Sequence, residues 1–158
     1  MTVGLIDFAK NIGAQLLGRD DEAAAVDDLN RNLIFANKLL RHVTAFGLPV
    51  TELKIAFADG VATIHGKAKD QATRERVVLA VGNTEGVSRV DDQMTVGIPE
   101  PAAALYTVKQ GDSLSKIAKQ YYGDAQKYPV IFDANKPMLK DPNLIYPGQV
   151  LRIPASAR

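Results

Sequence analysis

Residues 106–154 read YTVKQGDSLSKIAKQYYGDAQKYPVIFDANKPMLKDPNLIYPGQVLRIP, and this stretch decides the fold of the C-terminal third of the chain. It begins with a short strand at Tyr106–Val108 and ends with another at residues 150–154. Ser113 is suited to cap a first helix, because its hydroxyl accepts hydrogen bonds from the free amides of a helix start. Gly123 ends that helix, since glycine readily takes the left-handed conformation found there.

The second half of the stretch adds two signals. Apolar residues at Tyr128, Ile131 and Phe132 predict a second helix. Tyr146-Pro147-Gly148-Gln149 is typical of a type II turn, with proline at the second position and glycine at the third. The predicted order is strand, helix, helix, strand.

In this order and in its residues, the stretch resembles a LysM domain. The residues that carry the resemblance are Tyr106-Thr107-Val108, Gly111-Asp112-Ser113-Leu114, Ile117-Ala118, Tyr122-Gly123, Ile131, Asn135, Tyr146-Pro147-Gly148-Gln149, Leu151 and Ile153. The resemblance implies a groove for N-acetylglucosamine polymers, and an apolar surface with backbone donors suits a sugar ring. The groove residues that it implies are Gly111, Asp112, Ser113, Leu114, Asn143, Leu144, Ile145 and Tyr146. The structural alternative is that Ser113 only caps a helix, while Leu114 and Tyr146 pack the core.

A change in composition separates this module from the rest of the chain. Residues 98–104 read IPEPAAA, two prolines among small residues, which is typical of a short and fairly stiff linker. We therefore place the linker at 98–104 and the LysM-like domain at 105–155.

Upstream, a hairpin is predicted around Asp59-Gly60, a dipeptide that favours positive φ at both central positions of a two-residue turn. This turn sets Phe57 opposite Ala62 and Ile55 opposite Ile64, so the apolar side chains share one side of the pair. Residues 87–96 predict a third strand, with Val90, Met94 and Val96 on one face.

Two helices complete this half. The first carries an apolar stripe at three- and four-residue spacing and ends before Gly47 and Pro49. Its stripe consists of Val26, Leu29, Leu33, Ala36, Leu40 and Val43. The second helix starts at Asp70, its N-cap, and ends at Gly82. Its buried stripe consists of Thr73, Val77, Ala80 and Val81.

The first 22 residues form a leader with apolar residues at helical spacing, which predicts a short amphipathic helix packed on the neighbouring domain. The residues of this face are Leu5, Phe8, Ala9, Ile12 and Leu16. Asp7, Lys10 and Asn11 interrupt the apolar run that a signal peptide needs. The sequence has no apolar stretch of membrane-spanning length. We therefore expect a cytoplasmic protein.

The order helix, strand, strand, helix, strand predicts an α+β domain with one small sheet. Residues 25–97 resemble a BON domain, through this order and through VGNTEGVSRVDDQMTV at residues 81–96. We place the BON-like domain at 23–97 and the leader at 1–22. The chain as a whole resembles the small bacterial cytoplasmic potassium-binding BON–LysM proteins. The matching motifs are Gly4-Leu5, Phe8-Ala9-Lys10, Ala80-Val81-Gly82-Asn83, Val90-Asp91-Asp92-Gln93 and residues 135–140.

This resemblance implies that K⁺ is bound by backbone carbonyls of the leader and of the turn after the second BON helix. The residues that it implies are Ala9, Ile12, Gly82, Thr84 and Val87. A ring of carbonyl oxygens can replace the water shell of K⁺, and the last carbonyls of a helix carry partial negative charge. From the residues alone, the preferred interpretation of Gly82 and Gly86 is a helix cap and a turn, and it is the resemblance that makes an ion site an equal alternative. The resemblance implies a potassium sensor or buffer, and a peptidoglycan-binding protein is the alternative.

Composition and side-chain chemistry argue against other classes. A net charge of +1 does not suit a nucleic-acid binder. The chain has no cysteine, and neither His42 nor His65 has metal-ligand spacing or a nucleophile beside it. Asp91 and Asp92 are neighbours in a strand and point to opposite faces. We expect no enzyme, a monomer, K⁺ as the ligand, and a glycan or another protein as the partner of the LysM-like domain; a pure protein scaffold is the third alternative.

Overall fold

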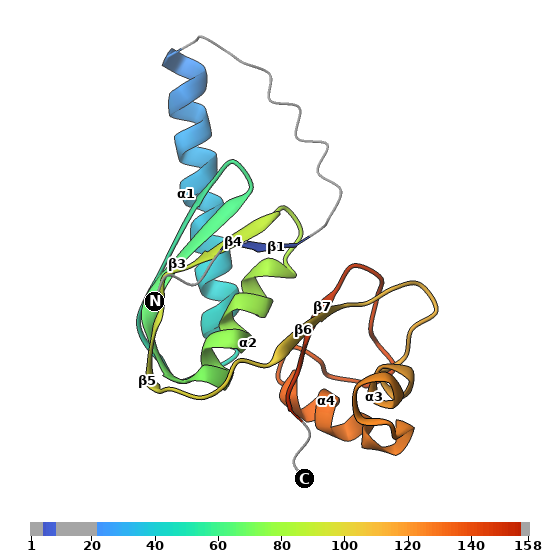
Figure 1. Cartoon of the computed structure of the whole chain (residues 1–158). Helices are drawn as coiled ribbons and strands as arrows, with labels where there is room; N and C mark the ends of the chain where they lie inside the picture. Colours follow the sequence, from blue (N-terminus) through green and yellow to red (C-terminus); the bar gives the residue numbers. More distant parts are fainter. Residues whose placement is uncertain (1–4, 9–21, 156–158) are drawn as a thin grey trace.

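The computed structural model describes residues 5–8 and 22–155, which form two α+β domains in the predicted order (Figure 1). The elements of the N-terminal domain are β1 (Ile6–Asp7), α1 (Glu22–Ala45), β2 (Val50–Ala58), β3 (Val61–Asp70), α2 (Gln71–Gly82), β4 (Arg89–Asp92) and β5 (Thr95–Ile98). Those of the C-terminal domain are β6 (Ala104–Thr107), α3 (Leu114–Tyr122), the 3-10 turn η1 (Ala125–Lys127), α4 (Tyr128–Ala134) and β7 (Val150–Ile153). Among the described helices, none combines the length and the apolar character that crossing a membrane requires.

The central hairpin β2–β3 has the predicted turn and register. Asp59 and Gly60 both have positive φ, 51° and 79°, as this two-residue turn requires. Ile55 pairs with Ile64 and Phe57 with Ala62. Ala62 and Ile64 are fully buried, so the apolar side of the hairpin faces the core.

The predicted third strand is two strands, which corrects the prediction of one strand over residues 87–96. Both β4 and β5 pair in parallel with β3. The break falls where the Asp92 carboxylate accepts a hydrogen bond from the Met94 amide, 3.0 Å away, and takes that amide out of the ladder. The guanidinium of Arg74, a residue of α2, lies 2.7 Å from the Asp92 carboxylate and holds it in this position.

The leader also differs from the prediction where it is described. Ile6–Asp7 form a strand, β1, which pairs antiparallel with β4, so a helix through residues 5–8 was wrong. The edge of β4 offers backbone partners that fix these residues in an extended conformation. Phe8 is buried at 1% exposure in the core of the N-terminal domain. Ala9, Ile12 and Leu16 lie outside the described residues.

Helix α1 is as long as predicted, but only part of its stripe is buried. Ala36 and Val43 lie in the core, whereas Val26, Leu29 and Leu33 are 57%, 62% and 61% exposed. Figure 1 shows the reason: the N-terminal part of α1 extends past the end of the sheet, so nothing among the described elements covers it.

The C-terminal domain follows the predicted pattern closely. Ser113 caps α3 by accepting from the Lys116 amide at 3.2 Å, and Gly123 ends it in the left-handed conformation, φ 73°. Gly148 has φ 89° and the Gln149 amide donates to the Tyr146 carbonyl, as a type II turn requires. Buried Asn135 ties α4 to β7 through hydrogen bonds with Ile131 and Arg152.

Candidate functional site

Helix α2 carries the turn in which the ion site was predicted. The Asp70 carboxylate caps the start of α2 by accepting a hydrogen bond from the Thr73 amide at 2.8 Å. Hydrogen bonding with the backbone and side chain of Thr73 lowers the pKa of the Asp70 carboxyl. At the other end, the Asn83 amide donates to the Leu79 carbonyl and the Thr84 amide to that of Val81. The helical bonding therefore continues past Gly82, and the cap interpretation of Gly82 is wrong.

The reason for glycine at position 82 is close packing. A Cβ on Gly82 would overlap the ring of Phe8, so only glycine lets the ring lie on the helix. The positive φ of this turn belongs instead to Gly86, at 96°, and the Phe35 ring covers Gly86.

Three of the five predicted ion-site residues lie in this one turn. Gly82 and Val87 are buried, and Thr84 is half-buried between them. The Thr84 carbonyl accepts from the Val87 amide at 3.1 Å, and a carbonyl oxygen has a second lone pair for another partner. Because the turn follows the C-terminal end of α2, its carbonyls carry partial negative charge.

The leader reaches the same turn from the other side. The Phe8 amide donates to the Ser88 carbonyl at 2.8 Å, while the Phe8 ring lies on Gly82. Phe8 therefore touches the residues at both ends of the turn. Ala9 and Ile12, the other two predicted ligands, lie outside the described residues.

The predicted sugar-groove residues fall into two hollows. Asp112, Ser113, Leu114, Asn143 and Ile145 line one cavity of about 340 Å³, together with Ser115, Tyr128 and Pro142. Leu144 and Tyr146 instead line a second cavity of about 350 Å³ between the two domains. Gly111 lines neither of these two cavities, although its carbonyl accepts from the Lys116 ammonium at 2.8 Å.

Several residues of the first hollow also have structural partners. The Asp112 carboxylate accepts from the Tyr106 hydroxyl at 2.7 Å and from the Lys109 amide at 2.8 Å. The bond to Tyr106 lowers the pKa of Asp112 and raises that of Tyr106 to about 12. Leu114 is buried in the core. The structural partners of Asp112, Ser113 and Leu114 therefore fix one wall of this hollow. Tyr128 packs on the core of the domain, and Asn143 is the exposed residue of the lining.

Comparison with known proteins identifies both halves of the chain. The BON domain model matches residues 36–98 and the LysM domain model residues 106–154. The chain is 44% identical, over 153 residues, to a protein of Escherichia coli O6:H1 named Potassium binding protein Kbp, and the match covers 96% of this chain and 99% of that protein. The chain belongs to this BON–LysM family.

Other relatives share only a short part of the chain. An uncharacterized protein of Deinococcus radiodurans is 58% identical over 50 residues, 32% of this chain and 19% of that protein. A Mycobacterium tuberculosis protein named Esterase Rv1288 is 47% identical over 53 residues, 34% of this chain and 11% of that protein. These matches have the length of a single module, so they say nothing about the function of the whole chain.

The BON and LysM domains meet along α2, and Asn83 makes the most specific contact. Its side-chain amide donates to the Val150 carbonyl and its side-chain oxygen accepts from the Val150 amide, both at 2.8 Å. The Tyr146 hydroxyl lies 3.5 Å from the Asn83 carbonyl, and burial raises the pKa of Tyr146. The residue beside Gly82 thus holds the last strand of the LysM domain.

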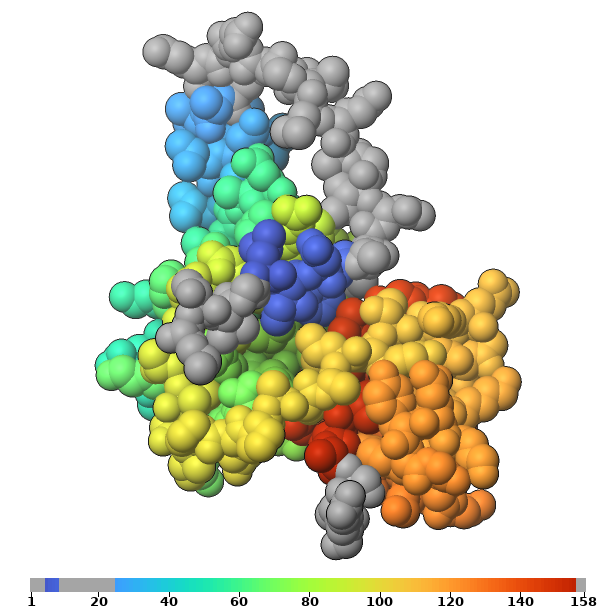
Figure 2. Space-filling view, viewed as in Figure 1, coloured from blue at the N-terminus to red at the C-terminus, as the bar shows by residue number. Residues whose placement is uncertain are grey.

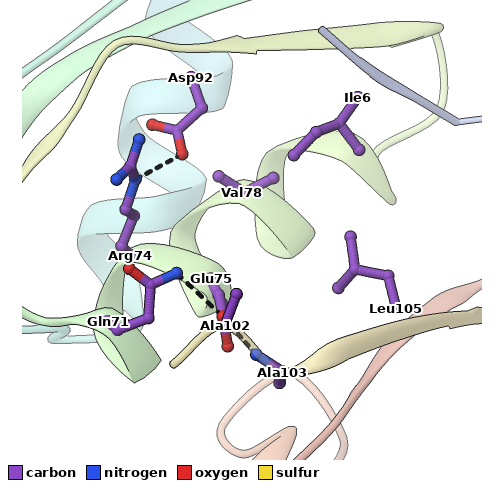
Figure 3. A pocket seen from close by; sticks show the side chains of 9 residues that line it. All are labelled: Ile6, Gln71, Arg74, Glu75, Val78, Asp92, Ala102, Ala103 and Leu105. Atoms are coloured by element: carbon purple, nitrogen blue, oxygen red, sulfur yellow. Dashed lines mark hydrogen bonds and ion pairs between the residues drawn. The ribbon is translucent and has the colours of Figure 1, made fainter. Parts of the chain in front are cut away.

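A buried ion pair forms the second contact between the domains. The Arg152 guanidinium of β7 lies 2.8 Å from the Glu75 carboxylate of α2, with both side chains about nine-tenths buried. Glu75 also accepts from the Ala103 amide and the Gln71 side chain, both at 2.9 Å. Figure 3 shows Glu75 at the edge of a cavity of about 110 Å³ between α2, β1 and the linker.

Sequence reasoning missed three contacts, because each joins residues far apart in the chain. They are the packing of Phe8 on Gly82, the hydrogen bonds of Asn83 with Val150 and the ion pair of Glu75 with Arg152. The other candidates stay apart: His42 stacks edge-on against Phe46, and His65 pairs with Lys54 in the hairpin. Among the residues that the structure describes, no group of three His, Asp or Glu side chains could hold a metal ion.

Proposed function

We propose that this protein binds K⁺ and acts as a potassium sensor or buffer in the cytoplasm. The observation that carries the proposal is the near full-length relation to Potassium binding protein Kbp, at 44% identity. The match covers 96% of this chain and 99% of that protein, so the relation includes most of the leader as well as the two domains. Catalysis has no place in this proposal, and we expect the protein to act as a monomer.

The proposed ligands are the backbone carbonyls of Gly82, Thr84 and Val87 with those of Ala9 and Ile12. Two contacts support this set: Gly82 and Ser88 flank the turn, and Phe8 of the leader touches both. Ala9 is the next residue after Phe8 in the sequence, and this adjacency supports its inclusion among the proposed ligands. Carbonyl oxygens suit a large and weakly hydrated ion such as K⁺.

Ion binding at this turn would also strengthen the contact between the domains. Asn83 lies between two of the proposed ligands in sequence and holds Val150 through two hydrogen bonds. A ligand that binds only the ordered arrangement stabilises it by mass action. We therefore expect K⁺ to stabilise the leader, the turn and the docked LysM domain together.

The test is thermal unfolding of the full chain in potassium chloride and in sodium chloride at equal ionic strength. We expect a higher midpoint in potassium chloride. Phe8→Leu, which loosens the packing on Gly82, should reduce the difference, and Gly82→Ala should abolish it. Asn143→Ala, an exposed change in the LysM groove, is the matched control and should keep it. Equal midpoints of the unmodified protein in the two salts would refute K⁺ binding.

A second candidate function is binding of an N-acetylglucosamine polymer by the LysM domain. Five of the predicted groove residues do line one hollow of about 340 Å³, which supports it. Binding of chitin oligomers, followed by calorimetry, tests this function. Saturable binding that Asn143→Ala weakens would support a glycan site, and absence of heat with the unmodified protein would refute it.

A further inference from the structure

The cavity between the BON and LysM domains is separate from the hollow that holds most of the predicted sugar-groove residues. Its volume is about 350 Å³, and small-molecule sites of roughly 300–1,000 Å³ occur preferentially at domain interfaces. Figure 2 shows the two domains packed against each other, with the red C-terminal residues at their junction. The lining comes from the last turns of α1, the end of α2 and the loop before β7. We call this space the interdomain cavity.

Aromatic rings from both domains line the interdomain cavity. The BON domain contributes Phe46, against which the His42 ring stacks edge-on with the centroids 4.9 Å apart. The LysM domain contributes Tyr146, which remains 44% exposed. The face of such a ring is the negative part of its quadrupole and attracts a cation within about 6 Å of the ring centre. Two domains therefore supply aromatic faces for a cation, and they do so together only while they are docked.

The charges around the interdomain cavity also favour a cation. No lysine, arginine, aspartate or glutamate is among the described residues of its lining, so a bound cation meets no permanent positive charge from these side chains. Ala80 and Thr84 place the C-terminal end of α2 in the wall, and this end of a helix carries partial negative charge. An anion would find the reverse: a partial negative charge and no lysine or arginine partner among the same described residues.

The remaining wall is apolar, and this narrows the class of cation. Met138, Leu139 and Leu144 line the cavity beside the rings. A small hydrated metal ion needs several oxygen ligands in place of its water, which apolar side chains cannot supply. An ammonium ion that carries methyl groups has an apolar surface, and aromatic rings bind such ions through their faces. The lining therefore suits a methylated organic cation.

We propose that the interdomain cavity binds a small organic cation of the quaternary ammonium class, between Phe46 of the BON domain and Tyr146 of the LysM domain. The proposal rests on the cavity and its side chains, and it is independent of K⁺ binding by backbone carbonyls. Because the two rings belong to different domains, the ligand binds only the docked arrangement. It therefore stabilises the contact between the domains by mass action.

Titration of the full chain with choline, followed by NMR, tests the proposal. Sodium chloride without potassium keeps the result independent of the proposed K⁺ site, and about pH 8 keeps imidazole side chains neutral. The matched control ligand is the neutral analogue of choline, in which a carbon atom replaces the charged nitrogen. We expect saturable shifts of the Thr84, Leu144 and Gln149 amides with choline. The analogue should bind about fivefold more weakly or worse, because it lacks the charge that the rings attract.

Variants of Tyr146 test the role of its ring. Tyr146→Leu should weaken choline binding about fivefold, because one aromatic face is lost. Tyr146→Phe keeps the ring and should retain the affinity. The matched control is Tyr121→Leu, since Tyr121 is another exposed tyrosine of the LysM domain and does not line the interdomain cavity. This control should bind choline as the unmodified protein does.

Three outcomes would overturn the proposal. The first is the absence of saturable shifts, or equal binding of choline and its neutral analogue, in the unmodified protein; neither result depends on a variant that folds. The second is equal affinity of Tyr146→Leu and the unmodified protein for choline. The third is a shift of the same amides by a chitin oligomer and none by choline, which would assign the interdomain cavity to a sugar.

Discussion

Replacing Asn83 by alanine is the sharpest test of how the BON domain holds the LysM domain. The substitution removes two 2.8 Å hydrogen bonds to the backbone of Val150. Val150 is only 4% exposed. A buried polar group left without a partner costs about 1–3 kcal/mol. For the amide and the carbonyl of Val150 together we expect the free energy of unfolding to fall by about 2–4 kcal/mol, since Asn83 is half-buried and water can replace part of the loss.

Two measurements on the full chain separate this effect from a general loss of stability. Urea unfolding gives the free energy, and hydrogen exchange followed by NMR reports the Val150 amide, which we expect to exchange much faster in the variant. The amide of Ile64 in the BON core should change little under native conditions. Asn143→Ala is the control and should leave both measurements unchanged. A Val150 amide that stays as protected in Asn83→Ala as in the unmodified protein would refute the role of Asn83.

Three further outcomes are expected. Glu75→Gln should lower the free energy of unfolding by about 3–5 kcal/mol, measured by urea unfolding, because Arg152 would keep a buried charge without its partner; a loss below 1 kcal/mol would contradict this. Phe8→Ala should cost about 3–5 kcal/mol, by the same measurement, and a neutral result would mean that the leader does not pack on Gly82. The hydrogen bond to Asp112 raises the Tyr106 pKa to about 12, above the ordinary tyrosine value of 10.0. The stability that this bond contributes is therefore present below about pH 10 and is lost as the pH rises towards 12. An absorbance titration of tyrosinate should show one late step that Tyr106→Phe removes, whereas an unchanged titration would contradict the bond to Asp112.

The C-terminal domain was predictable because its signals are local. Ser113 caps a helix a few residues away, Gly123 ends the same helix, and Pro147-Gly148 sets a turn of four residues. The hairpin at Asp59-Gly60 was predictable for the same reason, since the turn alone fixes the register of the two strands. In such places neighbouring residues are sufficient to determine the backbone.

The remaining features depend on distant partners. The leader has helical spacing at Leu5 and Phe8, but the free edge of β4 makes Ile6–Asp7 a strand. Gly82 resembles a helix cap in sequence, and only the position of the Phe8 ring shows why a side chain is excluded. The proposed ion site at residues 82–87 rests on a family resemblance, because carbonyl ligands leave no pattern of side chains that the sequence alone could reveal.

The pairing of Asn83 with Val150 also protects an open sheet edge. The LysM sheet has only two strands, β6 and β7, and strand edges with unpaired amides and carbonyls invite pairing with other chains. At Val150 the side chain of Asn83 takes the place of a third strand and satisfies both backbone groups. The BON domain thus covers the edge of β7 at Val150, and a LysM fragment separated from it would present these two backbone groups unpaired.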